Sequence, residues 1–400
     1  NTQKKNVPEL RFPGFEGEYS LDIFGNLATN KSDKFNPQNE NASIDIELDC
    51  IEQNTGRLIK IYNSKEFSSQ KNKFNPQNVL YGKLRPYLNK YYFTKKSGVC
   101  SSEIWVLKST KEDKLLNLFL YYFIQTKRYS DVASKSAGSK MPRADWGLIE
   151  NIRVYFPELC EQQKIGEFFS KLDRQIELEE QKLELLQQQK KCYMQKIFSQ
   201  ELRFKDDNGN DYPEWEEKKL GELSQIVRGA SPRPIKDPKW FNKESDIGWL
   251  RISDVTDQNG KIYHLEQKLS IEGQEKTRVL LTTHLLLSIA ASIGKPVMNF
   301  VKTGVHDGFL IFLNPKFNIF FMYYWLDYFK EKWSKYGQPG SQVNLNSEIV
   351  KSQTLNMPSN HEQEKVGLFF SRNEKLIELQ QEKIMYLKRR KQALILKMFI

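Results

Sequence analysis

The chain contains a long internal duplication, which limits its possible folds more than any other feature. The segment FPELCEQQKIGEFFSKLDRQIEL begins at Phe156, and MPSNHEQEKVGLFFSRNEKLIEL begins at Met357. The two align without a gap at an offset of 201 residues (357 − 156 = 201) up to Phe198 and Phe399. A match of this length at a fixed offset indicates that one structural unit is present twice.

Shorter repeats extend the duplication toward the N-terminal side of each copy. The tetrapeptide ELRF begins at Glu9 and again at Glu201, and Gly98-Val99 before IWVL parallels Gly304-Val305 before LIFL. Each copy is therefore a globular segment followed by a similar helix. The organisation that we predict is a first globular domain over 1–157, a first helix over 158–200, a second globular domain over 201–358 and a second helix over 359–400.

The repeated C-terminal segment of each copy has the hydrophobic spacing of a coiled coil. Its apolar residues step by four and three, which gives a narrow seam that needs a helical partner. In the first copy they are Ile165, Phe169, Leu172, Ile176, Leu183, Leu186, Tyr193 and Ile197, and in the second Val366, Phe370, Ile377, Ile384, Leu387, Leu394 and Met398. Each helix of about 39 residues would extend roughly 58 Å. The alternative is that each helix packs only on its own domain.

The order of the segments predicts antiparallel helices, since the first leads from domain one to domain two and the second returns. Polar residues interrupt both seams, and few alignments place them opposite one another. The alignment that we predict sets Glu179 against Lys391 and Lys190 against Gln380, because a slip by one heptad would bury a charge on an apolar residue.

The globular copies show short apolar runs between Gly, Pro, Asn and Ser turns, which is typical of buried strands. The predicted strands are Asn78–Leu80, Tyr91–Phe93, Ile104–Leu107, Leu285–Ile289 and Phe309–Leu313, and the predicted short helices are Lys114–Lys127 and Ile319–Trp333. The fold class that follows is mixed α/β (α+β), with two similar globular domains joined by two long antiparallel coiled-coil helices.

Composition favours a nucleic-acid partner. The formal net charge is +11, and hydrophobic residues make up 39% of the chain, so a folded and basic protein is expected. Cys50, Cys100, Cys160 and Cys192 form no C-x-x-C pair, and we expect buried thiols rather than a zinc site or disulfides. Without an apolar run of about 18 residues or a signal-peptide pattern, we expect a cytoplasmic protein that makes no use of a membrane.

Familiar catalytic motifs are absent from the sequence. Asn36-Pro37-Gln38 and Asn75-Pro76-Gln77 lack the second proline of the loop with which adenine methyltransferases hold a flipped base. No G-x-G-x-x-G follows a strand, and Ile289 stands where a phosphate-binding loop ending in Gly294-Lys295 needs glycine. The four histidines have no metal-ligand spacing. We therefore expect no catalytic residue, no metal and no cofactor in this chain.

Side chains that suit DNA reading gather in loops of both copies. Arg, Gln, Asn and Ser can pair with base edges, and Lys and Arg bind phosphates. The candidates in the first copy are Arg57, Lys60, Tyr62, Lys83, Arg85, Tyr87, Lys135, Ser136, Ser139, Lys140 and Arg143. Those in the second copy are Arg228, Ser231, Arg233, Lys236, Trp240, Arg251, Ser253, Asp254, Gln338, Ser341, Gln342 and Asn344.

Over nearly its whole length the sequence resembles the specificity subunits of type I restriction–modification systems. The resemblance is carried by the tandem layout, by the helix starts PELCEQQKIG and PSNHEQEKVG, and in the second copy by GASPRP, WLRISDV, LLSIAASIGKP, GFLIFLNP and GSQVNLN in this order. The first copy is less similar, with VLYGKLRPY and AGSKMPRADW where glycine–serine loops would stand.

The resemblance implies that each globular copy is a target-recognition domain for one half of a split double-stranded DNA target. It further implies that the helices hold the two recognition domains apart and dock two modification (methyltransferase) subunits. Restriction (translocase and nuclease) subunits then join this assembly. S-adenosylmethionine, ATP and Mg are then expected on those partner subunits. The alternatives are a stand-alone sequence-specific DNA-binding protein, and a nuclease or methyltransferase whose site the motif search missed.

Overall fold

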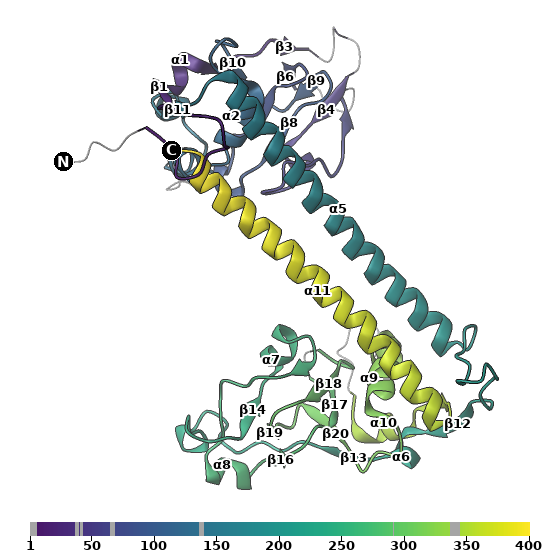
Figure 1. The fold of residues 1–400 in the computed structure, drawn as a ribbon. Helices are drawn as coiled ribbons and strands as arrows, with labels where there is room; N and C mark the ends of the chain where they lie inside the picture. Colours follow the sequence, from purple (N-terminus) through teal and green to yellow (C-terminus); the bar gives the residue numbers. More distant parts are fainter. Residues whose placement is uncertain are drawn as a thin grey trace. The chain divides into compact units, whose positions relative to one another are not determined.

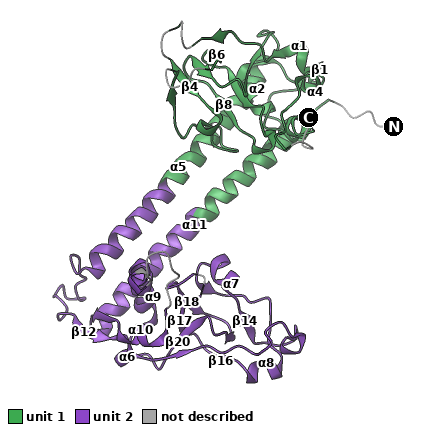
Figure 2. Ribbon diagram, turned by 180° about the vertical axis from the view of Figure 1, so that it is seen from behind, with its two compact units in different colours: residues 1–181, 381–400 green, residues 182–380 purple. Residues whose placement is uncertain are grey.

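The chain divides into two compact units, one formed by residues 1–181 and 381–400 and the other by residues 182–380 (Figure 2). The computed structural model in Figure 1 describes residues 6–36, 40, 43–64, 69–135, 140–290, 292–336 and 345–400. Two long helices, α5 (Leu159–Phe198) and α11 (Asn360–Met398), each begin in one unit and end in the other.

The first unit has three small sheets and short helices. Strand β1 (Ser20–Ile23) pairs antiparallel with β11 (Arg153–Phe156). A four-stranded sheet has the order β2 (Ala28–Thr29), β10 (Ile104–Ser109), β7 (Val79–Gly82), β8 (Tyr91–Phe93). A five-stranded sheet has the order β3 (Lys34–Phe35), β6 (Lys71–Phe74), β9 (Gly98–Cys100), β4 (Ile44–Ile46), β5 (Tyr62–Asn63). The helices are α1 (Phe24–Leu27), α2 (Asn117–Phe123), α3 (Lys127–Ala133) and α4 (Trp146–Ile149).

The second unit repeats this plan. Strand β12 (Glu216–Lys219) pairs antiparallel with β21 (Thr354–Met357). The larger sheet has the order β13 (Gln225–Arg228), β20 (Phe309–Leu313), β17 (Leu285–Ser288), β18 (Pro296–Asn299), β15 (Lys261–Ile262), and a three-stranded sheet has β14 (Gly248–Leu250), β19 (Thr303–Val305), β16 (Arg278–Leu280). The helices are α6 (Leu220–Leu223), α7 (Ile252–Asp257), α8 (Ile271–Glu275), α9 (Ile319–Phe329) and α10 (Ser347–Ser352).

The predicted fold class is confirmed. Strands at equivalent places pair alike in the two units, down to a parallel pair formed by β4 with β9 in one and by β14 with β19 in the other. The strands over Tyr91–Phe93 and Phe309–Leu313 have the predicted ends. The predicted helix Lys114–Lys127 is in fact α2 and α3, because the Thr126 hydroxyl accepts a hydrogen bond from the Tyr129 amide and starts a new helix there.

A buried arginine–glutamate pair attaches each long helix to its own unit. Glu161 in the first turn of α5 is fully buried, and its carboxylate accepts two hydrogen bonds from Arg11, at 2.8 and 2.7 Å. Glu362 in α11 is also fully buried, and Arg203 donates to it with Nη2 at 2.9 Å. In each unit, therefore, the arginine of the repeated ELRF motif and the glutamate of the repeated EQ motif form an ion pair.

The neighbouring glutamine completes the attachment. In the first unit, Gln162 donates to the carbonyls of Pro157 and Lys114 and accepts from the Leu116 amide at 2.9 Å, just before α2. Gln363 repeats this with Pro358 and with the Asn318 amide before α9. These residues satisfy backbone groups that the ends of the helices would otherwise leave unpaired.

Within each unit the long helices run antiparallel, as predicted, but the predicted alignment is wrong. In the first unit Lys391 pairs with Asp173 at 2.6 Å and Lys383 pairs with Glu179 at 2.5 Å. In the second unit Lys190 pairs with Glu374 at 3.1 Å. Glu179 thus meets a residue eight positions before Lys391, which corresponds to a slip of about one heptad.

The slip that we had excluded is stable because the charged residues in the seam find partners beside it. Lys391 reaches Asp173, next to Leu172, and also donates to the Gln125 side chain at 2.9 Å. Tyr122 donates to the same aspartate at 2.9 Å. The predicted alignment was based on the seam positions alone. It took no account of acidic residues beside the seam or of side chains of the globular domain.

The second unit contains the equivalent polar cluster. Tyr324 donates to Glu374 at 2.7 Å, and Lys261 joins Lys190 on this carboxylate. The pKa of Glu374 would be raised by its burial, but the two lysines hold it below the ordinary value.

The cysteine prediction is half right. Cys50 and Cys100 are buried, and burial raises the pKa of both thiols, whereas Cys160 and Cys192 are exposed on α5. Cys160 and Cys192 lie outside the heptad positions that face the seam, so the helix pattern gave no reason to expect them to be buried.

Candidate nucleic-acid interface

One residue, Asp307, contacts three predicted DNA-reading residues on the second globular domain, two through its carboxylate and one through its backbone carbonyl. Asp307 lies in the turn between β19 and β20 and accepts from the Ser231 hydroxyl at 2.8 Å and from Arg233 Nη2 at 2.7 Å. Its backbone carbonyl accepts from Arg228 Nε at 2.6 Å. The loop after β13 and the turn before β20 thus form one surface, on which both arginines are exposed.

Backbone contacts bring the loop and the turn this close. The amide of Gly229 donates to the Phe309 carbonyl and the amide of Ala230 to the Val305 carbonyl. A side chain at Gly229 would overlap the carbonyl oxygen of His306, so only glycine permits the approach.

His306 holds this turn in place from the protein interior. Its ring packs against Trp249 and Phe309, and its Nδ1 accepts from the Gly308 amide at 2.8 Å. Burial lowers the pKa of this imidazole. Burial alone would raise the pKa of Asp307, but the Ser231 hydrogen bond and the Arg233 charge hold it below its ordinary value. A neutral histidine therefore supports an ionised aspartate at neutral pH.

The other described candidates of the second copy divide into buried and exposed ones. Trp240 is buried and donates its indole N–H to the Pro234 carbonyl, and Asp254 is buried and binds Arg251 through both carboxylate oxygens. Lys236 and Ser253 are exposed. Gln338, Ser341, Gln342 and Asn344 lie outside the described residues.

In the first copy, two predicted clusters come together. The backbone from Lys83 to Arg85 bonds with Pro142 and Ala144, which brings Arg143 beside it. Arg143 binds both carboxylate oxygens of Glu103, while Arg85 and Tyr87 are exposed. Lys135 and Lys140 are exposed at the ends of the next loop, and Ser136 and Ser139 lie outside the described residues.

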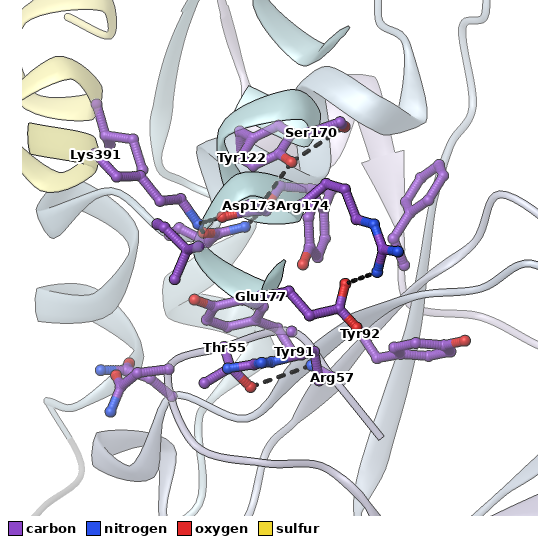
Figure 3. Close-up of a pocket in the computed structure, with 18 of the residues that line it drawn as sticks. Thr55, Arg57, Tyr91, Tyr92, Tyr122, Ser170, Asp173, Arg174, Glu177 and Lys391 are labelled. Carbon is purple, nitrogen blue, oxygen red and sulfur yellow. Dashed lines mark hydrogen bonds and ion pairs between the residues drawn. The ribbon is translucent and has the colours of Figure 1, made fainter. Parts of the chain in front are cut away.

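Arg57 faces a cavity rather than the outer surface of the first unit. The cavity has a volume of about 820 Å³ and is bounded by the globular part and by the portions of α5 and α11 in this unit (Figure 3). Arg57 pairs there with Glu180 of α5 at 2.5 Å and with Glu52 at 3.3 Å. Lys60 and Tyr62 both bind Asp49. Arg57 thus pairs with acidic side chains, whereas the backbone of Lys83 and Arg85 contacts Pro142 and Ala144.

The DNA-reading residues predicted from the sequence do not include Asp307, Glu103 or Arg278. Arg278 is exposed and donates from Nε to the Arg228 carbonyl at 2.7 Å. No local pattern in GVHDGF connects Asp307 with Ser231 and Arg233, because these partners are more than 70 positions away in the chain.

The described residues include no group of three or more His, Cys, Asp or Glu side chains that could hold a metal ion. They also include no helix that is long and apolar enough to cross a membrane.

Comparison with known proteins gives one family. The family model described as the type I restriction modification DNA specificity domain matches residues 18–188 and again residues 212–389. The specificity subunit of the type I restriction enzyme MjaVIII from Methanocaldococcus jannaschii is 26% identical over 310 residues, which cover 72% of this chain and 71% of that protein. The EcoDI specificity subunit from Escherichia coli is 25% identical over 169 residues, covering 41% and 37% of the two chains.

Solved structures share the fold. A chain from a study of complex assembly and conformational transition of the type I R-M system has a TM-score of 0.61 at 17% identity, covering 94% of this chain and 96% of that one. The type I restriction–modification S subunit from M. genitalium has a TM-score of 0.57 at 14% identity, covering 98% and 99%.

Proposed function

The chain belongs to the family of type I restriction–modification DNA specificity domains, present here twice, and we propose from this premise that each domain reads one half of a bipartite DNA target. The chain is a DNA sequence-specificity subunit. The observation that supports a half-site for each domain is the duplication itself. The strand pairing is shared, while the polar residues of the loops differ between the copies.

We propose that the long helices dock two modification subunits, with restriction subunits joining the assembly. Both helices expose apolar residues one heptad apart on equivalent positions, namely Leu178 and Leu185 on α5 and Leu379 and Tyr386 on α11. These side chains are 48–65% exposed. Exposed apolar side chains repeated on two helices favour a protein partner.

Catalysis then belongs to the partner subunits, which would bind S-adenosylmethionine, ATP and Mg, and the whole assembly would act on DNA in the cytoplasm. The proposal assigns to this chain affinity and sequence preference only. Exposed arginines held in fixed orientations suit that task, because a guanidinium can pair with guanine through two N–H groups.

An exchange of one domain tests the half-site assignment. Residues 201–358 are replaced by the same segment of a relative with a different target, and cells carrying the modification subunits are analysed by methylome sequencing. We expect one half of the methylated target to change and the other half to stay. A change in both halves would contradict the assignment, and an equivalent exchange of 1–157 is the matched control.

A further inference from the structure

We propose that Asp307 is a positioning residue for base reading by the second domain, and that Arg278 belongs to the same reading surface. The inference rests on the proposed function. Asp307 would hold Arg233 through its carboxylate and Arg228 through its backbone carbonyl, and the Arg228 carbonyl would in turn hold Arg278, so that the three arginines form a row with fixed orientations toward DNA.

Each arginine in the row is anchored by one N–H group. Arg278 donates from Nε to the carbonyl of Arg228, and Arg228 donates from Nε to the carbonyl of Asp307, at 2.7 and 2.6 Å. Arg233 donates from Nη2 to the Asp307 carboxylate at 2.7 Å. The row is thus continuous, and its last two members end on the same residue.

The anchoring leaves donors for DNA. A guanidinium has five N–H groups, so an arginine held by one of them keeps enough to pair with the O6 and N7 acceptors of guanine or with a phosphate. All three side chains are exposed, and that of Arg233 has 68% of its surface accessible. An arginine without such an anchor would lose side-chain conformational entropy when it binds DNA, and the anchors reduce this entropic cost.

The charge of Asp307 argues against a purely electrostatic role in DNA binding. A carboxylate on a DNA-facing surface repels phosphates, so it weakens binding to any DNA unless it contributes something else. The carboxylate contacts Ser231 and Arg233, and the backbone carbonyl of Asp307 contacts Arg228; all three residues belong to the segment predicted to read DNA. Removal of the carboxylate should therefore lower sequence preference without lowering the affinity for DNA in general.

The experiment uses the full chain and selection from randomised duplex DNA, followed by titration of the selected target and of a duplex without it. We expect Asp307→Ala to lose roughly tenfold or more in preference at the second half-site, while the first half-site is unchanged. Affinity for the duplex without the target should stay equal or rise. Asp307→Asn keeps one acceptor oxygen, and its preference at the second half-site should lie between those of wild type and Asp307→Ala.

Asp246→Ala is the matched control, since Asp246 is an exposed carboxylate of the same domain that pairs with Lys302. It removes the same charge and should leave both half-sites intact. Undiminished preference in Asp307→Ala would overturn the proposal. A wild-type chain that selects no motif would instead refute the proposed function.

A second pair of variants covers the case in which Asp307→Ala disturbs the turn. Arg233→Lys and Arg278→Lys keep the positive charge at exposed positions but remove the planar fork. We expect relaxed preference at the second half-site from each. If both lysine variants keep the wild-type motif, the arginine row does not read bases and the proposal fails.

Discussion

At the scale of single residues, Asp327 is one of the differences between the two polar clusters beside the long helices. In the first unit the corresponding position is Gln125, which accepts a hydrogen bond from Lys391. In the second unit Asp327 lies near Lys190 and Glu374, and burial raises its pKa despite the attraction of Lys190. The folded chain therefore holds a proton on Asp327 more tightly than the unfolded chain does.

This shift predicts a stabilising substitution. Because the pKa is raised on folding, the free energy of unfolding falls as pH rises from the unfolded-state pKa, about 3.9, through the folded-state pKa. Asp327→Gln removes this fall in the free energy of unfolding and introduces the residue type that the first unit has at the corresponding position, Gln125. We expect the variant to be more stable than wild type at pH 7 in urea unfolding followed by circular dichroism. Below about pH 3.5 the difference should vanish.

The exposed Asp257 provides the comparison for this test, because the same domain carries it on α7. Asp257→Asn should match wild type at both pH values. A less stable Asp327→Gln at pH 7 would mean that the carboxylate contributes more through Lys190 than its burial costs.

The buried glutamates at the helix starts give a second prediction at this scale. Arg203 shields Glu362, which has no exposed side-chain surface. Arg203→Met should lower the free energy of unfolding by about 3–5 kcal/mol, because it leaves a buried charge with only the Trp215 indole N–H, 3.0 Å away, besides backbone groups. The double variant Arg203→Met, Glu362→Leu should recover much of this loss in thermal unfolding. A loss below about 1 kcal/mol in the single variant would show that water reaches the site.

At the scale of elements, a charge exchange tests the alignment of α5 and α11. Lys391→Glu places a carboxylate against Asp173 and should weaken the first unit by about 1–3 kcal/mol. Adding Asp173→Lys should restore most of the loss. Adding Glu179→Lys instead should not, since Glu179 pairs with Lys383. Rescue by Glu179→Lys rather than Asp173→Lys in chemical unfolding would support the alignment predicted from the seam.

The elements also show where sequence reasoning ends. Heptad spacing was enough to predict two long helices, because it depends on the sequence of one helix at a time, and the order of the segments predicted that they run antiparallel. The alignment depends on residues outside the seam, such as Asp173 and Gln125, and no periodic pattern marks them. The candidate interface follows the same division. Arg228, Ser231 and Arg233 stood in one recognisable loop, whereas their common partner Asp307 lies beyond several strands in the sequence.

At the scale of the whole molecule, affinity for DNA and preference for a sequence should respond to different residues. The surplus of 11 positive charges acts on any DNA through phosphates, and the released counterions make that part of the affinity salt-dependent. Base reading depends on a few oriented donors. Variants of lysines predicted to contact DNA should therefore change the salt dependence of binding and leave the selected sequence motif unchanged.

Lys83 and Lys236, one candidate from each domain, carry this last prediction. Each change to Gln should reduce the slope of log affinity against log salt concentration by about one, because one phosphate contact is lost. The double variant should lose about two, and the sequence motif selected from random DNA should stay the same. Lys375→Gln on α11 is the control, since that lysine pairs with Glu378 and lies outside the recognition domains. If a lysine variant altered the motif at one half-site, that lysine would contact a base edge, and the separation of affinity from sequence preference would fail at its position.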